Sequence, residues 1–403
     1  MSSDTEAATM AADGEGARGS GIGLCLSGGG YRAALFHLGA VRRLNELGVL
    51  SKVTTVSAVS GGSILAAHLA EVLRPWPEPG AVVGDFDERV ARPFRAFTSR
   101  NIRTAPFLGR LLPWNWGAKR SAVDLLAAAY ERHLTGLRLP ELPDRPEFVF
   151  CSTDMSYGVN WVFSRRQIGD WQAGYLRPAP DWSLARAVAA SSCFPPVFAP
   201  LRLGLDPRAL VGGKARSGPA RDRAVASIGL TDGGVYDNMG LEPVWRSHRT
   251  LLVSNGGATF DFGPDKGLLW RLQRYTSIVS RQASAVRQRW LIAGYQRDRL
   301  TGAYWSIANS CDDEDRVGYP PGLVREVIAQ VRTDLDRFSE AEQAVLENHG
   351  YVVADCAVQR RAAELVAPGA RPFMLPNPDW LDEAKVRRAM ADSHRQKLPF
   401  GRR

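Results

Sequence analysis

The residues in this chain that are best suited to chemistry lie at two glycine-rich turns, each directly after a short apolar run. Residues 22–26 run into Ser27-Gly28-Gly29-Gly30, and residues 53–59 run into Ser60-Gly61-Gly62. A helical pattern follows each turn, so each segment has the strand, turn and helix order of a parallel α/β sheet. Because active groups gather at the carboxyl ends of parallel strands, we expect the two turns to lie together at one edge.

Ser60 is the candidate nucleophile. A serine on a sharp turn between a strand and a helix holds its hydroxyl away from the backbone. Small neighbours, here Gly61 and Gly62, let the helix pack closely and let a substrate carbonyl approach. The usual pattern of this turn is G-x-S-x-G, and Ala58 takes the place of the first glycine. A glycine-rich turn that serves packing alone is the alternative interpretation.

The first turn offers the second part of an acyl-transfer site. The backbone N–H groups of Gly28, Gly29 and Gly30 precede a helix and could hold a developing oxyanion, and Arg32 adds positive charge. The same segment through Ala33 also fits G-x-G-x-x-A, a pattern that binds dinucleotides. That interpretation requires an acidic residue at the end of the next strand, and VTTVSAVSGG has none.

A carboxylate that could serve as the base closes a later strand. The segment 225–230 has the pattern of a buried strand, and Asp232 follows it in the sequence Thr231-Asp232-Gly233-Gly234. The strand-end rule places Asp232 at the same edge as Ser60. Asp237 and Asn238 come shortly afterwards and are predicted to fix the loop, with Asp237 as an alternative base.

These three motifs occur in an order that resembles the patatin-like phospholipases. The matching segments are SGGGYRAALFHLGA from residue 27, the serine turn at Ser60, and DGGVYDNMG from Asp232, within residues 20 to 260. The missing first glycine and the letters SGG are similar to the turn of cytosolic phospholipase A2. The resemblance implies a three-layer α/β/α fold with a mostly parallel sheet and helices on both faces. It also implies a serine–aspartate dyad without histidine.

Carried over by position, the resemblance gives each motif a role. Ser60 is the nucleophile, Asp232 is the base, and the glycine loop with Arg32 holds the oxyanion. The implied activity is that of a serine acyl hydrolase acting on lipid esters, of the phospholipase A or lysophospholipase type, with no cofactor and no metal. Two other classes remain open: an esterase with a Ser-His-Asp triad that uses His248 or His349, and a non-catalytic lipid- or nucleotide-responsive protein on the same fold.

The composition and net charge of the chain indicate which partners to expect and whether metal sites or disulfides are expected. The chain has 403 residues, 45% of them hydrophobic and 23% charged, and a net charge of +9. A positive surplus suggests an anionic partner such as a membrane surface. No nucleic-acid partner is expected, because the basic residues are dispersed and match no known motif. Five cysteines without a C-x-x-C pair argue against zinc and a disulfide framework, and favour reduced thiols.

The chain divides into three predicted parts. Residues 1–20 are small and polar and are expected to form a disordered leader rather than a secretory signal. Residues 21–375 form the hydrolase domain, in which 95–120 mixes aromatic, aliphatic and basic residues. That segment suits a lid or membrane-facing insertion, or a buried insertion whose arginines pair with acids elsewhere. Residues 376–403 form a basic tail, and a cytoplasmic protein, peripheral on membranes at most, is expected.

Overall fold

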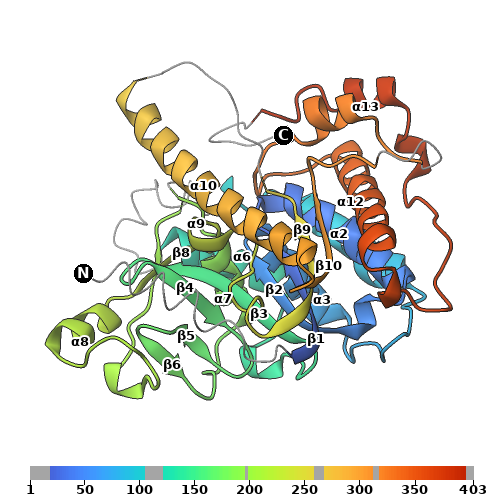
Figure 1. Cartoon of the computed structure of the whole chain (residues 1–403). Helices are drawn as coiled ribbons and strands as arrows, with labels where there is room; N and C mark the ends of the chain where they lie inside the picture. The colour runs from blue at the N-terminus through green and yellow to red at the C-terminus, as the bar shows by residue number, and fades with distance from the viewer. Residues whose placement is uncertain (1–18, 105–120, 196–197, 258–266, 312–316, 396–403) are drawn as a thin grey trace.

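The computed structural model of the chain describes residues 19–104, 121–195, 198–257, 267–311 and 317–395 (Figure 1). Its centre is one sheet, in the order β10-β9-β1-β2-β3-β4-β5-β6, with β8 beside β3 and β7 beside β8. The strands are β1 (Gly19–Leu26), β2 (Val53–Val59), β3 (Glu147–Asp154), β4 (Val159–Phe163), β5 (Ile168–Asp170), β6 (Gly174–Leu176), β7 (Leu201–Arg202), β8 (Gly229–Asp232), β9 (His248–Asn255) and β10 (Thr301–Ser306).

The predicted fold class is confirmed. The five strands from β10 to β3 are all parallel, while β4, β5, β6, β7 and β8 add antiparallel pairs on the far side. The helices are α2 (Gly30–Glu46), α3 (Gly61–Val72), α4 (Arg92–Thr98), α6 (Ala122–His133), α7 (Leu184–Ser192), α8 (Pro219–Ala226), α9 (Gly234–Asp237), α10 (Leu268–Gln296), α11 (Pro321–Leu323), α12 (Glu340–Arg361) and α13 (Glu383–Ala389).

Helices cover both faces of the sheet because alternate side chains of each buried strand point to opposite sides. In β9, Leu251 and Val253 pack in one cluster with Leu291 of α10. Leu252 between them joins the large cluster on the other face, which contains Phe36 of α2 and Leu346 of α12. Figure 1 shows α10 lying across one face of the sheet, with α2 and α12 side by side away from it.

Two glycines explain how closely α2 and α12 pack. A Cβ atom at Gly39 would collide with the carbonyl of Glu347, and one at Gly350 would collide with the carbonyl of Phe36. From the sequence alone, the capping-box pattern of residues 339–342 begins a helix, and Gly350 after His349 is predicted to end it. That prediction is wrong, because α12 continues to Arg361 and Gly350 is the point of contact with α2.

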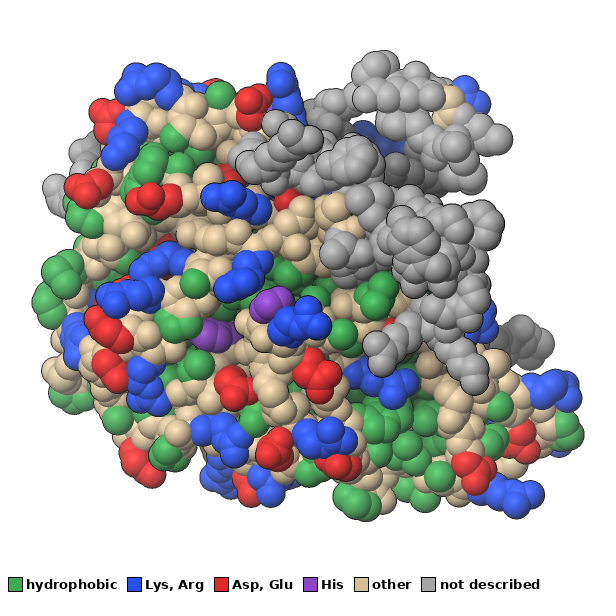
Figure 2. All heavy atoms as spheres, turned by 180° about the vertical axis from the view of Figure 1, so that it is seen from behind, with side chains coloured by type: hydrophobic (Ala, Val, Ile, Leu, Met, Phe, Trp, Pro, Cys, Tyr) green, Lys and Arg blue, Asp and Glu red, His purple; other side chains and the backbone are tan. Residues whose placement is uncertain are grey.

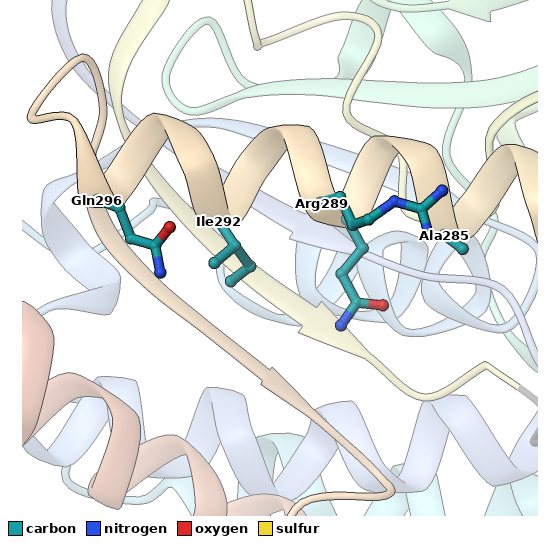
Figure 3. Close-up of a pocket in the computed structure, with 5 residues that line it drawn as sticks. Ala285, Arg289, Ile292 and Gln296 are labelled. Atoms are coloured by element: carbon teal, nitrogen blue, oxygen red, sulfur yellow. The ribbon is translucent and has the colours of Figure 1, made fainter.

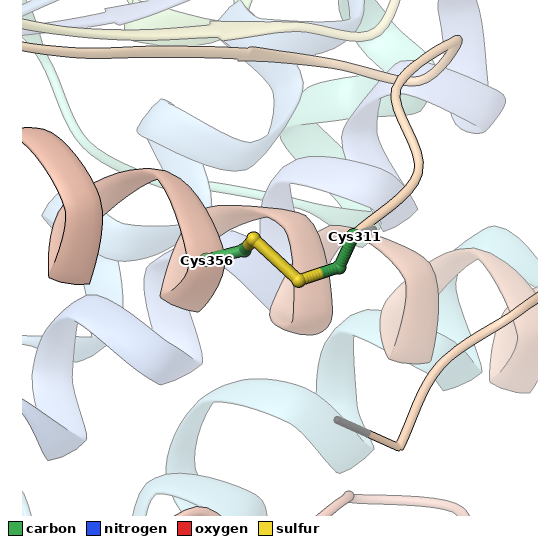
Figure 4. Close-up of a disulfide and its surroundings, with 2 residues drawn as sticks. All are labelled: Cys311 and Cys356. Carbon is green, nitrogen blue, oxygen red and sulfur yellow. A yellow bond between two sulfur atoms is a disulfide. The ribbon is translucent and has the colours of Figure 1, made fainter. Parts of the chain in front are cut away.

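The prediction of reduced thiols is wrong for one pair of cysteines. Cys311, which follows β10, is bonded to Cys356 of α12, with the two Cα atoms 6.1 Å apart (Figure 4). The other three cysteines are free and buried: Cys25, Cys151 and Cys193. The bonded pair is separated by 45 positions in the chain, so no local spacing reveals it.

Several segment predictions fall at the edge of the described residues. Of the predicted leader, only residues 19 and 20 are described, and they begin β1. Of 95–120, residues 95–104 are described; Arg95 pairs with Asp87 and Glu347, and Arg103 pairs with Asp334. These two arginines of the segment are thus paired with acidic residues. Residues 105–120 and the tail end 396–403 lie outside the described residues. No helix in the described parts of the chain combines the length and apolarity that crossing a membrane requires.

Candidate active site

The turn that carries Ser60 is strained in the way a nucleophile turn requires. Ser60, between β2 and α3, has φ +48° and ψ −112°, a backbone conformation that residues other than glycine rarely adopt. Its neighbours have no room for a side chain, since a Cβ at Gly61 would collide with the Gly30 carbonyl and one at Gly62 with the Leu26 carbonyl. The glycines therefore let α3 start against the first turn, as the sequence predicted.

The register of β3 brings Asp232 to this turn. Parallel β2 ends with Val59 opposite Cys151 of β3. At the next position, Ser152 lies opposite Asp232, the last residue of β8, which runs antiparallel to β3. β2 and β8 thus occupy the same edge of β3 and end towards each other, so Ser60 and Asp232 meet. The sequence argument that placed Asp232 at this edge used a rule for parallel strands, whereas β8 runs antiparallel to β3.

The Asp232 carboxylate is buried in a site that holds it beside the serine. Only 4% of its surface is exposed, and the Gly234 N–H donates to its Oδ1 at 2.7 Å. Burial raises the pKa of Asp232 to about 6, and the hydrogen bonds from Gly234 and the Ser60 side chain offset part of that rise. A carboxylate with a raised pKa is a stronger base than an exposed aspartate, whose pKa is about 3.9.

Ser191 at the end of α7 connects both turns, and the sequence reasoning missed it. Its hydroxyl accepts the Ser60 N–H at 2.9 Å and donates to the Cys151 carbonyl at 2.6 Å. Its own carbonyl accepts the Gly233 N–H at 3.3 Å. A serine in the small-residue helix SLARAVAASS gives no sign of this role, because the partners are 40 to 131 positions away in the chain.

The glycine loop lies against the serine turn, but its three N–H groups are not equivalent. A Cβ at Gly28 would lie 3.2 Å from Cβ of Ser60, so the loop and the turn are in contact. The Gly28 N–H donates to the Asn238 carbonyl at 2.9 Å, which removes it from the predicted oxyanion donors. Gly29 and Gly30 have φ values of +141° and +57°. Among the described residues, no hydrogen-bond acceptor is recorded for either of their N–H groups.

Arg32 supports the loop in a different way from the one predicted. Its guanidinium donates to the Gly256 carbonyl at 3.0 Å and to the Val331 carbonyl at 2.8 Å. Burial lowers the pKa of Arg32 to about 10. Because these carbonyls engage the guanidinium, Arg32 anchors the glycine loop to two distant segments.

Asp237 fixes the loop after the candidate base, as predicted. Its carboxylate accepts the backbone N–H groups of Met239, Leu241 and Glu242 at 3.1, 2.6 and 2.9 Å. These bonds leave it turned into its own loop, while Asp232 faces Ser60.

The two histidines considered for a triad, His248 and His349, have other hydrogen-bond partners. His248 opens β9, at the end of the sheet opposite to the serine turn, and its Nδ1 lies 2.8 Å from the Ser247 hydroxyl. His349 is buried in α12, where its Nε2 lies 2.9 Å from the Ile307 carbonyl, and burial lowers its pKa to about 4. All six histidines are within the described residues, and none has a recorded hydrogen bond to Ser60 or Asp232.

The family resemblance predicted from the sequence is confirmed. A family model described as patatin-like phospholipase matches residues 24–245, which is more than half of the chain. No curated protein sequence matches this chain.

Among solved structures, one of human GIVD cytosolic phospholipase A2 with methyl gamma-linolenyl fluorophosphonate has 16% identity and a TM-score of 0.45, covering 86% of this chain and 58% of that one. VipD from Legionella pneumophila has 14% identity and a TM-score of 0.34, covering 83% and 66%. In another structure of the human enzyme the match has 16% identity and a TM-score of 0.40 and covers 58% of this chain. It spans 45% of that chain, less than half of its length.

The bonds of Ser191 generate a prediction that separates positioning from packing. Ser191→Ala removes the partner of the Ser60 N–H, and an unsatisfied buried group costs about 1–3 kcal/mol of unfolding free energy. Relaxation of the serine turn should also lower kcat about tenfold to 10²-fold. Ser192→Ala is the matched control, since its hydroxyl bonds the Val188 carbonyl at 2.7 Å and Tyr130. Equal kcat in the two variants, measured on a soluble ester and compared with their stabilities, would contradict the positioning role.

Proposed function

The chain belongs to the patatin-like phospholipase family, and from that premise we propose that it hydrolyses fatty-acyl esters with Ser60 as nucleophile and Asp232 as general base. Family membership supports a lipid acyl hydrolase. The observation that carries the residue assignment is the contact of a strained serine turn with a buried carboxylate at the shared edge of β3. Phospholipids or lysophospholipids are the proposed substrates.

The proposed reaction has two steps. Asp232 takes the proton of the Ser60 hydroxyl while its oxygen attacks the ester carbonyl, and the N–H groups of Gly29 and Gly30 hold the tetrahedral oxyanion. Collapse expels the alcohol, which leaves with the proton from Asp232. Water, deprotonated by Asp232, then attacks the acyl-enzyme and releases the fatty acid and the Ser60 hydroxyl. Every proton is carried by a group of this chain, so the sequence of steps balances without a cofactor.

The dyad can be tested against both alternatives with substitutions. Ser60→Ala and Asp232→Asn should remain folded and lose turnover to near background. No single His→Ala variant should lower kcat/KM more than about tenfold, whereas loss of a triad member costs about 10³-fold or more. Ser63→Ala tests the register of the motif, because Ser63 lies one turn further along α3 and is the competing nucleophile.

The outcomes of that test separate the three classes. A folded histidine variant that loses 10³-fold activity, as expected of a triad member, would replace the dyad with a triad. An active Ser60→Ala with an inactive Ser63→Ala would shift the nucleophile. A wild-type protein that neither turns over esters nor labels with a fluorophosphonate would be the non-catalytic member.

The raised pKa of Asp232 predicts an unusual acid limb. With a pKa of about 6, Asp232 is mostly ionised at pH 7.5 and about one-tenth ionised at pH 5, so kcat/KM on a soluble short-chain ester should fall about tenfold between them. A carboxylate with an ordinary pKa near 3.9 would stay ionised at pH 5. Circular dichroism at pH 5 controls for unfolding. An acid limb below pH 4.5 would contradict a raised pKa of the catalytic base, whichever residue that base is.

The glycine loop predicts a loss confined to kcat. A Cβ at Gly29 would lie 2.8 Å from the Gly256 oxygen, at a φ that favours glycine, so Gly29→Ala should displace an oxyanion donor and lower kcat about 10²-fold or more. Arg32→Ala should also impair activity, because the Gly256 carbonyl loses its donor. Gly218→Ala is the control, since Gly218 has a similar φ of +144° in open space. Wild-type kcat in folded Gly29→Ala and Arg32→Ala proteins would mean that the loop serves packing alone.

A further inference from the structure

Helix α10 exposes apolar side chains on its outer face, whereas a surface helix of a globular protein normally buries its apolar face against the core. Its inner side packs through Leu291 and through Tyr295, whose hydroxyl donates to the Leu251 carbonyl at 2.8 Å. On the outer side, Tyr275, Val279 and Val286 are 61%, 69% and 55% exposed. These three residues are four and seven positions apart, so they form one stripe along the centre of the outer face.

The charge of α10 has one sign. The helix contains five arginines and no aspartate or glutamate in its 29 residues, and the arginines are Arg271, Arg274, Arg281, Arg287 and Arg289. By contrast, Figure 2, which views the molecule from behind, shows acidic and basic side chains interspersed. A projecting helix with an apolar stripe and cationic flanks has the features of a helix that lies in a membrane interface.

The helix is connected to the proposed active site. The Ser280 hydroxyl donates to the Gly234 carbonyl at 3.4 Å, two residues beyond Asp232, and Arg287 lies 3.8 Å from the Asp237 carboxylate. Before these contacts, the N-terminal half of α10 projects past the other helices (Figure 1). The helix that carries the outer stripe therefore also contacts the loop of the candidate base.

A hollow runs along the C-terminal half of the same helix. It has a volume of about 410 Å³, and its lining residues all belong to α10: Ala285, Gln288, Arg289, Ile292 and Gln296 (Figure 3). Arg289 is exposed and lies one turn from Val286. A lipid phosphate beside the stripe would have a guanidinium and amide donors within reach.

We propose that the outer face of α10 docks the protein on an anionic lipid bilayer, with Tyr275, Val279 and Val286 inserted among the acyl chains and with Arg289, beside them, at the phosphates. This surface rests on the proposed function in one respect, that the substrate of a lipid acyl hydrolase lies in such a bilayer. It differs from the segment that the sequence suggested for membrane contact, 95–120.

The charge of the helix selects this occupant over two others. A second copy of the chain would place one set of arginines against another, which opposes self-association through this face. A nucleic acid would neutralise the arginines but would leave the exposed valines in contact with water or with phosphates. Only a surface that is both anionic and apolar, as a lipid bilayer is, can neutralise the positive charge and also bury the exposed apolar side chains.

The test measures binding without hydrolysis. Ser60→Ala protein is sedimented with vesicles of phosphatidylcholine and phosphatidylglycerol in equal amounts, and with vesicles of phosphatidylcholine alone. Binding should favour the anionic vesicles and weaken with salt. Val279→Asn with Val286→Asn should lower the partition coefficient about tenfold or more, and Arg289→Gln about fivefold.

A matched pair controls for loss of exposed valine in general. Val211 and Val317 are 51% and 49% exposed, and Val211 pairs with Tyr175 of β6, at the opposite edge of the sheet from β10. Val211→Asn with Val317→Asn should bind anionic vesicles as the parent does. In the active background, the α10 pair should hydrolyse a soluble short-chain ester at the parental rate, so failure of the enzyme proposal would appear there and not in vesicle binding.

Three results would overturn the proposal. The first is equal binding to neutral and anionic vesicles at all salt concentrations. The second is an unchanged partition coefficient in the α10 pair, or the same loss in the control pair. The third is a dimer, detected by analytical ultracentrifugation, that the α10 substitutions dissociate, since a second copy would then occupy the face.

Discussion

The proposed chemistry depends on how β2 and β8 divide one edge of β3. Along this edge, β2 supplies the partner of Cys151 and antiparallel β8 supplies the partner of Ser152. Backbone hydrogen bonding fixes both registers, so the ends of the two strands cannot separate without breaking ladder bonds. Ser60 and Asp232 are thereby held together although they are 172 positions apart in the sequence. The side chains need no further device to find each other, only turns that direct them into the same space.

Both turns cost free energy of folding, which the packing around them must offset. Ser60 holds a backbone conformation that costs about 1–3 kcal/mol, and Asp232 is buried where its ionised form is disfavoured. Both costs serve the proposed reaction, because the strained conformation forms the sharp turn that carries the nucleophile and the burial strengthens the base. Ser191 is the residue that makes the two compatible, since its hydroxyl holds one turn and its carbonyl holds the other.

Features that depend on neighbouring residues could be predicted from the sequence, and features that depend on residues far apart in the chain could not. The serine turn, the glycine loop and the Asp232 turn are local motifs, and each was found from consecutive residues. The antiparallel direction of β8, the bonds of Ser191 and the Cys311–Cys356 disulfide depend on partners at least 40 positions away, so no spacing rule applies to them. Gly350 was misinterpreted for the same reason. Its role depends on contact with α2, which is distant in the chain, and residue type alone does not distinguish a glycine at a helix contact from one that ends a helix.

The glycine loop shows that the site extends beyond the part of the chain that the family model matches, residues 24–245. Arg32 of the loop bonds the carbonyls of Gly256 and Val331, and the Tyr31 N–H donates to the Asp334 carbonyl at 2.9 Å. Asp334 in turn is paired with Arg103. A left-handed glycine loop has little stability of its own, because glycine loses the most backbone freedom on folding. The proposed oxyanion donors are therefore held in place by the C-terminal part of the chain, and substitutions around Val331 and Asp334 should act on kcat through the loop although they touch neither member of the dyad.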